Sequence, residues 1–139
     1  MLGIREKHLY GTETYEDLQA FIFKKAREMD VDVDLFQSNY EGELVDRIQR
    51  AYGKVDGIII NPAAYTHTSI AILDALKAVN LPAAEVHLTD VTKREPFRQI
   101  SYAGMACQAH FIGMGFEGYA KAMEWMKENV TPEKPIEKE

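Results

Sequence analysis

The sequence lacks the features that mark membrane and secreted proteins. Its strongest apolar run, Gly57 to Ile60, is far shorter than the ~20 residues that a membrane-spanning helix needs. The N-terminus has none of the charged, apolar and small-residue zones of a secretory signal peptide. Cys107 is the single cysteine, so no disulfide can form within one chain, which is typical of a reducing compartment. We therefore expect a cytoplasmic protein with no membrane partner.

Positive charge is also scarce. The chain has 16 lysine and arginine residues against 22 aspartate and glutamate residues, which gives a net charge of -6 at pH 7. Proteins that bind a phosphate backbone normally present a basic face, and no dense basic cluster compensates for the deficit here. A nucleic-acid partner is therefore not expected.

The apolar residues alternate between helical and extended spacing. The length of 139 residues suits one domain, which we expect over residues 1–130, followed by a charged, flexible tail over 131–139. Helices are predicted over about 15–29, 44–52, 69–79 and 116–129, and strands over about 31–38, 57–60, 83–88 and 107–113. This alternation predicts an α/β fold of the flavodoxin-like kind, an open parallel sheet with helices on both faces.

The opening strand of such a sheet is missing, because the alternation begins with a helix. In the flavodoxin-like strand order 2-1-3-4-5, the opening strand lies inside the sheet, so its absence removes a central element. A stable domain then needs a replacement for that strand.

Polar residues gather where two of the predicted strands end, which is the edge at which such folds bind ligands. The strand at 57–60 runs into Asn61 and, a few residues later, His67. The strand at 83–88 carries Glu85 and His87, and alternation along a strand places both side chains on one face. These residues predict a polar pocket wall with two histidines and a carboxylate.

The loop after the second of these strands indicates the charge of the ligand. It supplies Thr89, Arg94 and Arg98, and guanidinium groups match carboxylates, so we expect a small anionic ligand. Two other interpretations stay open: the histidines could be structural, or they could hold a metal ion with Glu85. The metal interpretation is less favoured, because no compact ligand motif is present and the arginines would repel a cation.

Five blocks of the sequence resemble the type II 3-dehydroquinate dehydratases (type II dehydroquinases) in order and spacing. The blocks are Gly3-Ile4-Arg5-Glu6 through Tyr10-Gly11, Phe36-Gln37-Ser38-Asn39 with Glu41-Gly42-Glu43-Leu44, Asn61-Pro62 through Thr66-His67-Thr68-Ser69, Glu85-Val86-His87-Leu88, and Arg94-Glu95-Pro96-Phe97-Arg98. The resemblance implies a flavodoxin-like fold, a dodecamer, no cofactor and no metal. It also implies a hydro-lyase that converts 3-dehydroquinate to 3-dehydroshikimate by anti elimination through an enolate.

The resemblance also assigns roles to single residues. Tyr10 would be the base that removes a proton beside the ketone, with Arg5 next to it, and His87 would be the general acid. Glu85 is placed to hold a histidine, although the sequence does not indicate which one. The implied substrate-binding residues are Asn61, His67, Leu88, Thr89, Arg94 and Arg98, with Asp74 reaching the site of a neighbouring subunit.

The family's first strand and its Asn-Gly-Pro-Asn turn have no counterpart in Met1-Leu2-Gly3. A start assigned too late, a truncated chain and a diverged copy are the three explanations, and we expect the first. In-frame upstream codons for an apolar strand would support it. Because the turn supplies an asparagine to the family's site, the alternative function is a catalytically inactive, oligomer-forming or small-anion-binding relative.

Overall fold

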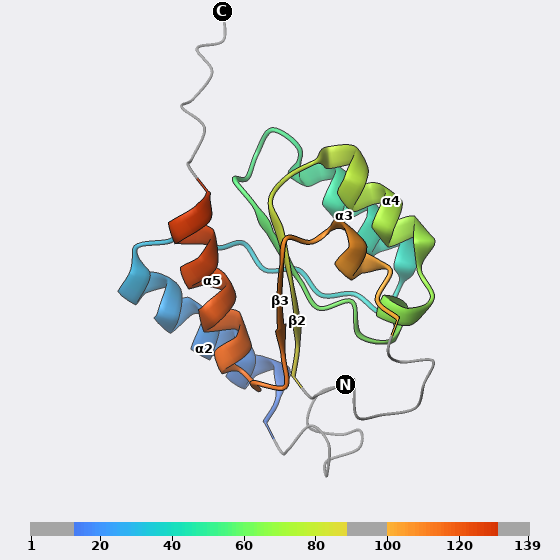
Figure 1. Cartoon of the computed structure of the whole chain (residues 1–139). Coiled ribbons are helices and arrows are strands. Elements are labelled where there is room, and N and C mark those ends of the chain that lie inside the picture. Colours follow the sequence, from blue (N-terminus) through green and yellow to red (C-terminus); the bar gives the residue numbers. More distant parts are fainter. Residues whose placement is uncertain (1–12, 89–99, 131–139) are drawn as a thin grey trace, which may run out of the picture.

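A computed structural model of the chain describes residues 13–88 and 100–130. The elements in these two ranges follow one another as helices and short parallel strands (Figure 1). In chain order they are α2 (Tyr15–Met29), α3 (Glu41–Ala51), β1 (Ile58–Ile60), the 3-10 helix η1 (Ala63–His67), α4 (Ile70–Val79), β2 (Ala83–His87), the 3-10 helix η4 (Ala103–Ala106), β3 (Ala109–Ile112) and α5 (Glu117–Asn129). The four predicted helices are confirmed, with ends that differ from the predicted ones by a few residues at most. The tail at 131–139 lies outside the described residues.

The strands form one parallel sheet in the order β1-β2-β3. Ile60 pairs with Glu85, and Glu85 pairs with His110, so the three strands end at a common edge. The middle strand β2 is buried along its whole length. This burial explains why the sequence of β2 shows no simple alternation of apolar and polar residues.

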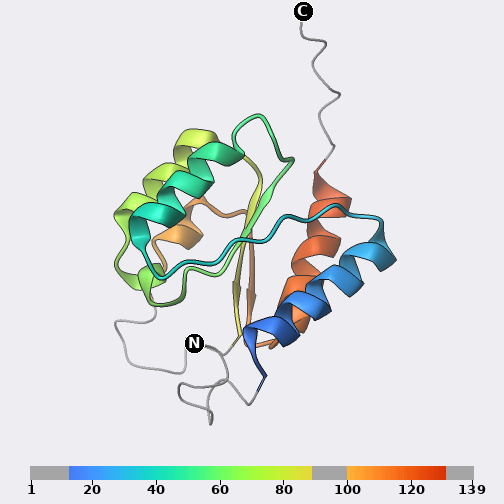
Figure 2. The same cartoon turned by 180° about the vertical axis from the view of Figure 1, so that it is seen from behind.

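Helices cover both faces of the sheet, as the sequence predicts (Figures 1 and 2). On one face, α2 and α5 pack against the strands, and on the other face lie α3, α4 and η4. The core against α4 includes Ile72 and Leu76, and the core between α2 and α5 includes Ile22 and Met123. No helix in the described ranges is both long and apolar enough to cross a membrane.

Local sequence signals set where the helices begin and end. Thr14 and Asp17 form a capping box at the start of α2, in which each side chain accepts the other's backbone N–H. Ser69 caps α4 by accepting from the backbone of Ile72. Asp30 and Asn80 end α2 and α4 in the left-handed conformation that suits a helix C-cap.

Residues 31–38 do not form the predicted strand. In the order 2-1-3-4-5 the second strand pairs only with the opening strand, and the described residues supply no such partner. The predicted alternation of side chains is nevertheless present. Val31, Val33 and Leu35 pack against the core between α2 and α5, whereas Asp32 and Asp34 are exposed. The segment, in cyan in Figure 2, therefore covers apolar surface as an extended chain without joining the sheet.

Two isoleucines of α4 test this packing. Ile72 is fully buried, so Ile72→Ala is expected to lower the free energy of unfolding by about 2–5 kcal/mol, because it removes apolar contacts and leaves a cavity. Ile70→Ala on the same helix is the matched control, since Ile70 is 56% exposed, and a change below about 1 kcal/mol is expected. Denaturant unfolding at fixed protein concentration measures both. Equal losses in the two variants would contradict the assigned core.

Candidate active site

The residues predicted to bind and react lie at the carboxyl ends of β1 and β2. Asn61 directly follows β1, His67 ends η1, and His87 is the last residue of β2. Glu85 lies two residues before His87 on the same face of β2, as strand alternation predicts. Residues from two segments, 61–67 and 85–87, thus lie at one edge of the sheet.

Glu85 is a buried carboxylate, with an exposed fraction of 3%. His87 Nε2 lies 3.0 Å from Oε2, Ser101 Oγ donates to the same oxygen at 2.7 Å, and His110 Nδ1 lies 2.5 Å from Oε1. Burial alone would raise the pKa of Glu85, but the hydrogen bonds from His87, Ser101 and His110 outweigh it and lower the pKa to about 2. The group is therefore an anion held by three donors.

The contact with Glu85 determines which nitrogen of His87 can transfer a proton. Since the ionised carboxylate can only accept, Nε2 of His87 must carry a proton and donate it. Nδ1 is the ring nitrogen that remains for a reaction partner. The sequence left open which histidine Glu85 serves, and the structure shows that it contacts His87 and His110.

His67 is held in a different way. Its Nδ1 lies 2.8 Å from the backbone carbonyl of Ile100, which can only accept a hydrogen bond, so Nδ1 carries a proton. In the neutral ring, Nε2 is then an acceptor that can receive a hydrogen bond from a hydroxyl group. This tautomer suits a residue that binds a polyhydroxylated ligand.

Three other predicted site residues lie in the described ranges, and they differ in what they contact. The Asn61 side chain accepts from the backbone of Ala63 at 3.1 Å and so supports the turn after β1. The carbonyl of Leu88 accepts from the backbone of Gly115 at 3.0 Å. Asp74 is exposed on the outer side of α4, so the structure does not bring it to Glu85 and His87 within this chain.

Five predicted site residues lie outside the described ranges, namely Arg5, Tyr10, Thr89, Arg94 and Arg98. Within those ranges, no group of three or more histidine, cysteine, aspartate or glutamate side chains is arranged to hold a metal ion.

Sequence reasoning missed three residues around Glu85. Ser101 Oγ accepts a hydrogen bond from Gly104 N and donates one to Glu85 Oε2. Gly104 must lack a side chain, since a Cβ there would lie 2.5 Å from Glu85 Oε1 and 2.7 Å from Ser101 Oγ. The third is His110, and a histidine in the middle of an apolar strand was a usable signal.

Cys107 is a small core residue. Its side chain is buried and contacts the carbonyl of Ala103 at 3.3 Å. Burial, with a further contribution from the negative charge of Glu85, raises the pKa of the thiol to about 12. The neutral thiol is a poor nucleophile, so Cys107 has no part in the acid–base chemistry.

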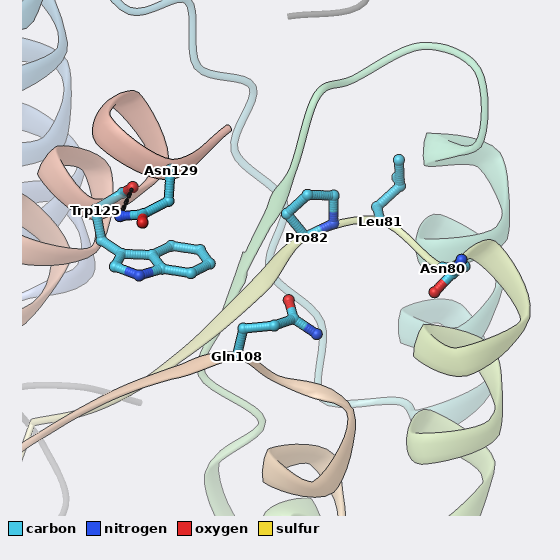
Figure 3. A pocket seen from close by; sticks show the side chains of 6 residues that line it. All are labelled: Asn80, Leu81, Pro82, Gln108, Trp125 and Asn129. Carbon is cyan, nitrogen blue, oxygen red and sulfur yellow. Dashed lines mark hydrogen bonds between the residues drawn. The ribbon is translucent and has the colours of Figure 1, made fainter. Parts of the chain in front are cut away.

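A pocket of about 300 Å³ lies at the opposite edge of the sheet (Figure 3). Its lining is Asn80, Leu81, Pro82, Gln108, Trp125 and Asn129, which precede β2 and β3 or lie on α5. The Gln108 carbonyl accepts from Ala83 N at 2.8 Å, and the Asn129 amide donates to the Trp125 carbonyl at 3.0 Å. These amides support the backbone, and none of the predicted site residues lines the pocket.

The fold and the site define a flavodoxin-like α/β protein with an acid–base centre at the carboxyl edge of its parallel sheet. Residues 1–127 match the model of the family described as Dehydroquinase class II. The chain belongs to this family.

Relatives of known name cover nearly the whole chain. A 3-dehydroquinate dehydratase of Caldicellulosiruptor bescii is 51% identical over 129 residues, which are 92% of this chain and 89% of the relative. One of Clostridium acetobutylicum is 48% identical over 126 residues, 91% and 88% of the two chains. The crystal structure of type II dehydroquinase from Butyrivibrio crossotus is similar with a TM-score of 0.88 and 44% identity, over 91% of this chain and 88% of that one. The fold and family predicted from the sequence are thereby confirmed.

The charge of Glu85 predicts how stability depends on pH. A carboxyl whose pKa is lowered in the folded state stabilises that state above its unfolded pKa, near 4.5, and the contribution is lost as pH falls toward 2. Glu85→Gln is therefore expected to lower the free energy of unfolding by about 3 kcal/mol at pH 7 and to flatten its decline between about pH 5 and 2. Denaturant unfolding across this pH range measures both effects.

Glu117→Gln is the control for that prediction, because Glu117 is an exposed carboxylate in the first turn of α5. Its effect is expected to stay below about 1 kcal/mol. If wild type and Glu85→Gln declined in parallel on acidification, the low pKa assigned to Glu85 would be wrong.

Proposed function

We propose that this protein is a hydro-lyase that dehydrates 3-dehydroquinate to 3-dehydroshikimate. The observation that carries the proposal is His87, held through Nε2 by the buried, ionised Glu85 at the carboxyl end of β2. Membership of the dehydroquinase family and relatives named 3-dehydroquinate dehydratase at about half identity support the reaction and its substrate. None of these relatives gives support to the catalytically inactive alternative.

The reaction is an anti elimination through an enolate. A base takes a proton from the carbon beside the ketone, and the electrons of that C–H bond pass into the enolate. The enolate then re-forms the ketone as the C–O bond to the hydroxyl breaks. His87 gives its Nδ1 proton to that hydroxyl, which leaves as water, while Glu85 holds the proton on Nε2 and stabilises the ring in its charged form before transfer.

We assign the base to Tyr10, with Arg5 beside it; both residues lie outside the described ranges. A free phenol has a pKa of about 10, so only about one molecule in a thousand is ionised at neutral pH. A neighbouring guanidinium stabilises the phenolate and raises that fraction. The pairing of Tyr10 with Arg5 is assigned by resemblance. It explains how a tyrosine can act as a base near neutral pH.

Binding of the substrate is assigned to the remaining residues of the edge. Nε2 of His67, as an acceptor, suits a substrate hydroxyl, and Asn61 at the end of β1 is assigned to another. Arg98 is assigned to the substrate carboxylate, and Arg94 is assigned to substrate binding by resemblance. Leu88 and Thr89 are assigned to contribute backbone amides.

Asp74 supports an oligomeric site. It is exposed on α4, where a neighbouring subunit can approach it, which supports the role that the resemblance assigns to it. We therefore propose a homo-oligomer, a dodecamer by resemblance, in the cytoplasm. Whether its role is aromatic biosynthesis or quinate breakdown depends on the organism's other enzymes.

Replacement of the general acid tests the protonation of the leaving hydroxyl. His87→Gln is expected to lower kcat by roughly 10²–10⁴, because the amide cannot protonate the leaving hydroxyl. The conjugated enone of the product allows turnover to be followed by ultraviolet absorbance. Thermal stabilisation by 3-dehydroquinate is expected to persist in the variant, and near-normal kcat would contradict the assignment of His87.

Replacement of the base tests the removal of the proton beside the ketone. Tyr10→Phe keeps the ring and removes the phenol oxygen, so kcat is expected to fall by at least about 10³ while substrate binding changes little. The same absorbance assay gives kcat, and substrate-dependent thermal stabilisation reports binding. A variant that retained turnover would require a different base.

A further inference from the structure

His110 is a titratable side chain to which the proposed reaction gives no role. It lies within β3, between Ala109 and Phe111, and its side chain is 43% exposed. The parallel pairing of β3 with β2 places His110 directly beside Glu85. Side chains of directly paired residues project from the same face of a sheet, so His110 meets Glu85 on the face that also carries His87.

The two oxygens of Glu85 have different partners. Oε2 is contacted by His87 and Ser101, whereas among the described residues His110 alone donates to Oε1, at 2.5 Å. Because the carboxylate is an acceptor, Nδ1 of His110 is the donor in this contact. A terminal carboxylate has a broad rotational preference of its own, so partners on both oxygens are needed to fix its plane.

We propose that His110 is a positioning residue for the dehydration, which by donating from Nδ1 to Oε1 fixes the Glu85 carboxylate so that Oε2 stays aligned with His87 Nε2. The inference rests on the proposed function. The hydrogen bond from His110 extends the supporting network of the general acid from β2 to β3. A proton donor that is held in one orientation transfers its proton more effectively than one whose support rotates.

A pair of variants separates the hydrogen bond from the bulk of the ring. In His110→Asn the side-chain nitrogen Nδ2 is attached at the same bond separation from Cβ as Nδ1 of histidine, so the donor is retained. His110→Val removes the donor and keeps a residue that suits a strand. Because 43% of the histidine side chain is exposed, neither change opens a large cavity, and thermal unfolding with circular dichroism verifies the fold.

Steady-state kinetics with 3-dehydroquinate are expected to show a loss of kcat by roughly tenfold or more in His110→Val. KM is expected to change by less than about twofold, because His110 affects His87 rather than substrate binding. His110→Asn is expected to restore kcat to within about threefold of wild type. A purely structural role would lower the thermal stability of both variants without this selective recovery of kcat.

Three results would overturn the inference: unchanged kcat in His110→Val, equal impairment of His110→Val and His110→Asn, or a loss confined to KM. If His110→Val did not fold, His110→Ala would be judged by the same outcomes. Wild-type protein without turnover would refute the proposed function and this inference together. An active wild type with an unaffected valine variant would refute the inference alone.

Discussion

The carboxyl edge of the sheet depends on one constraint, an ionised carboxylate buried on the middle strand. Removing a charge from water is costly unless donors replace the lost hydration, and Glu85 has three of them. They come from β2, from the segment before η4 and from β3. The register of the sheet, the turn at Ser101 and the missing side chain at Gly104 must therefore all be correct for the charge to be tolerated. The same requirement holds the three donors in place, because a donor that moved would leave the buried carboxylate without one of its hydrogen bonds.

The segment at 31–38 shows that side chains can be buried as in a strand without any strand pairing. Val31, Val33 and Leu35 keep an inward alternation, because apolar surface on α2 and α5 is available to cover. Strand hydrogen bonds need a neighbouring backbone as well, and the described residues do not supply one beside this segment. Hydrophobic alternation therefore predicted the facing of the side chains correctly and the strand wrongly. The facing of the side chains depends on local sequence, whereas a strand depends on a partner elsewhere in the chain.

The distinction between local sequence and distant partners also decides how much of the site could be predicted. Helices, caps and the positions of His67, Glu85 and His87 follow from local patterns, and the family follows from the five sequence blocks. The partners of Glu85 do not, because Ser101 and His110 reach it through the pairing of β2 with β3 and the path of the intervening segment. No local pattern specifies the register of two parallel strands separated by more than twenty residues. Tyr10 and the predicted site arginines, Arg5, Arg94 and Arg98, lie outside the described ranges, so their assignment depends on resemblance.

The two site histidines show how surroundings give one residue type two uses. Each is held by one ring nitrogen, His87 by the anion of Glu85 and His67 by the neutral carbonyl of Ile100. An anion stabilises an adjacent positive charge strongly in a buried site, whereas a carbonyl dipole does so much less. A general acid must carry an extra proton before the reaction, so the partner of His87 is suited to proton transfer. A residue that only accepts a hydrogen bond from substrate needs the neutral ring, which the partner of His67 allows. The division of labour proposed for the histidines thus follows from what holds them, rather than from the rings themselves.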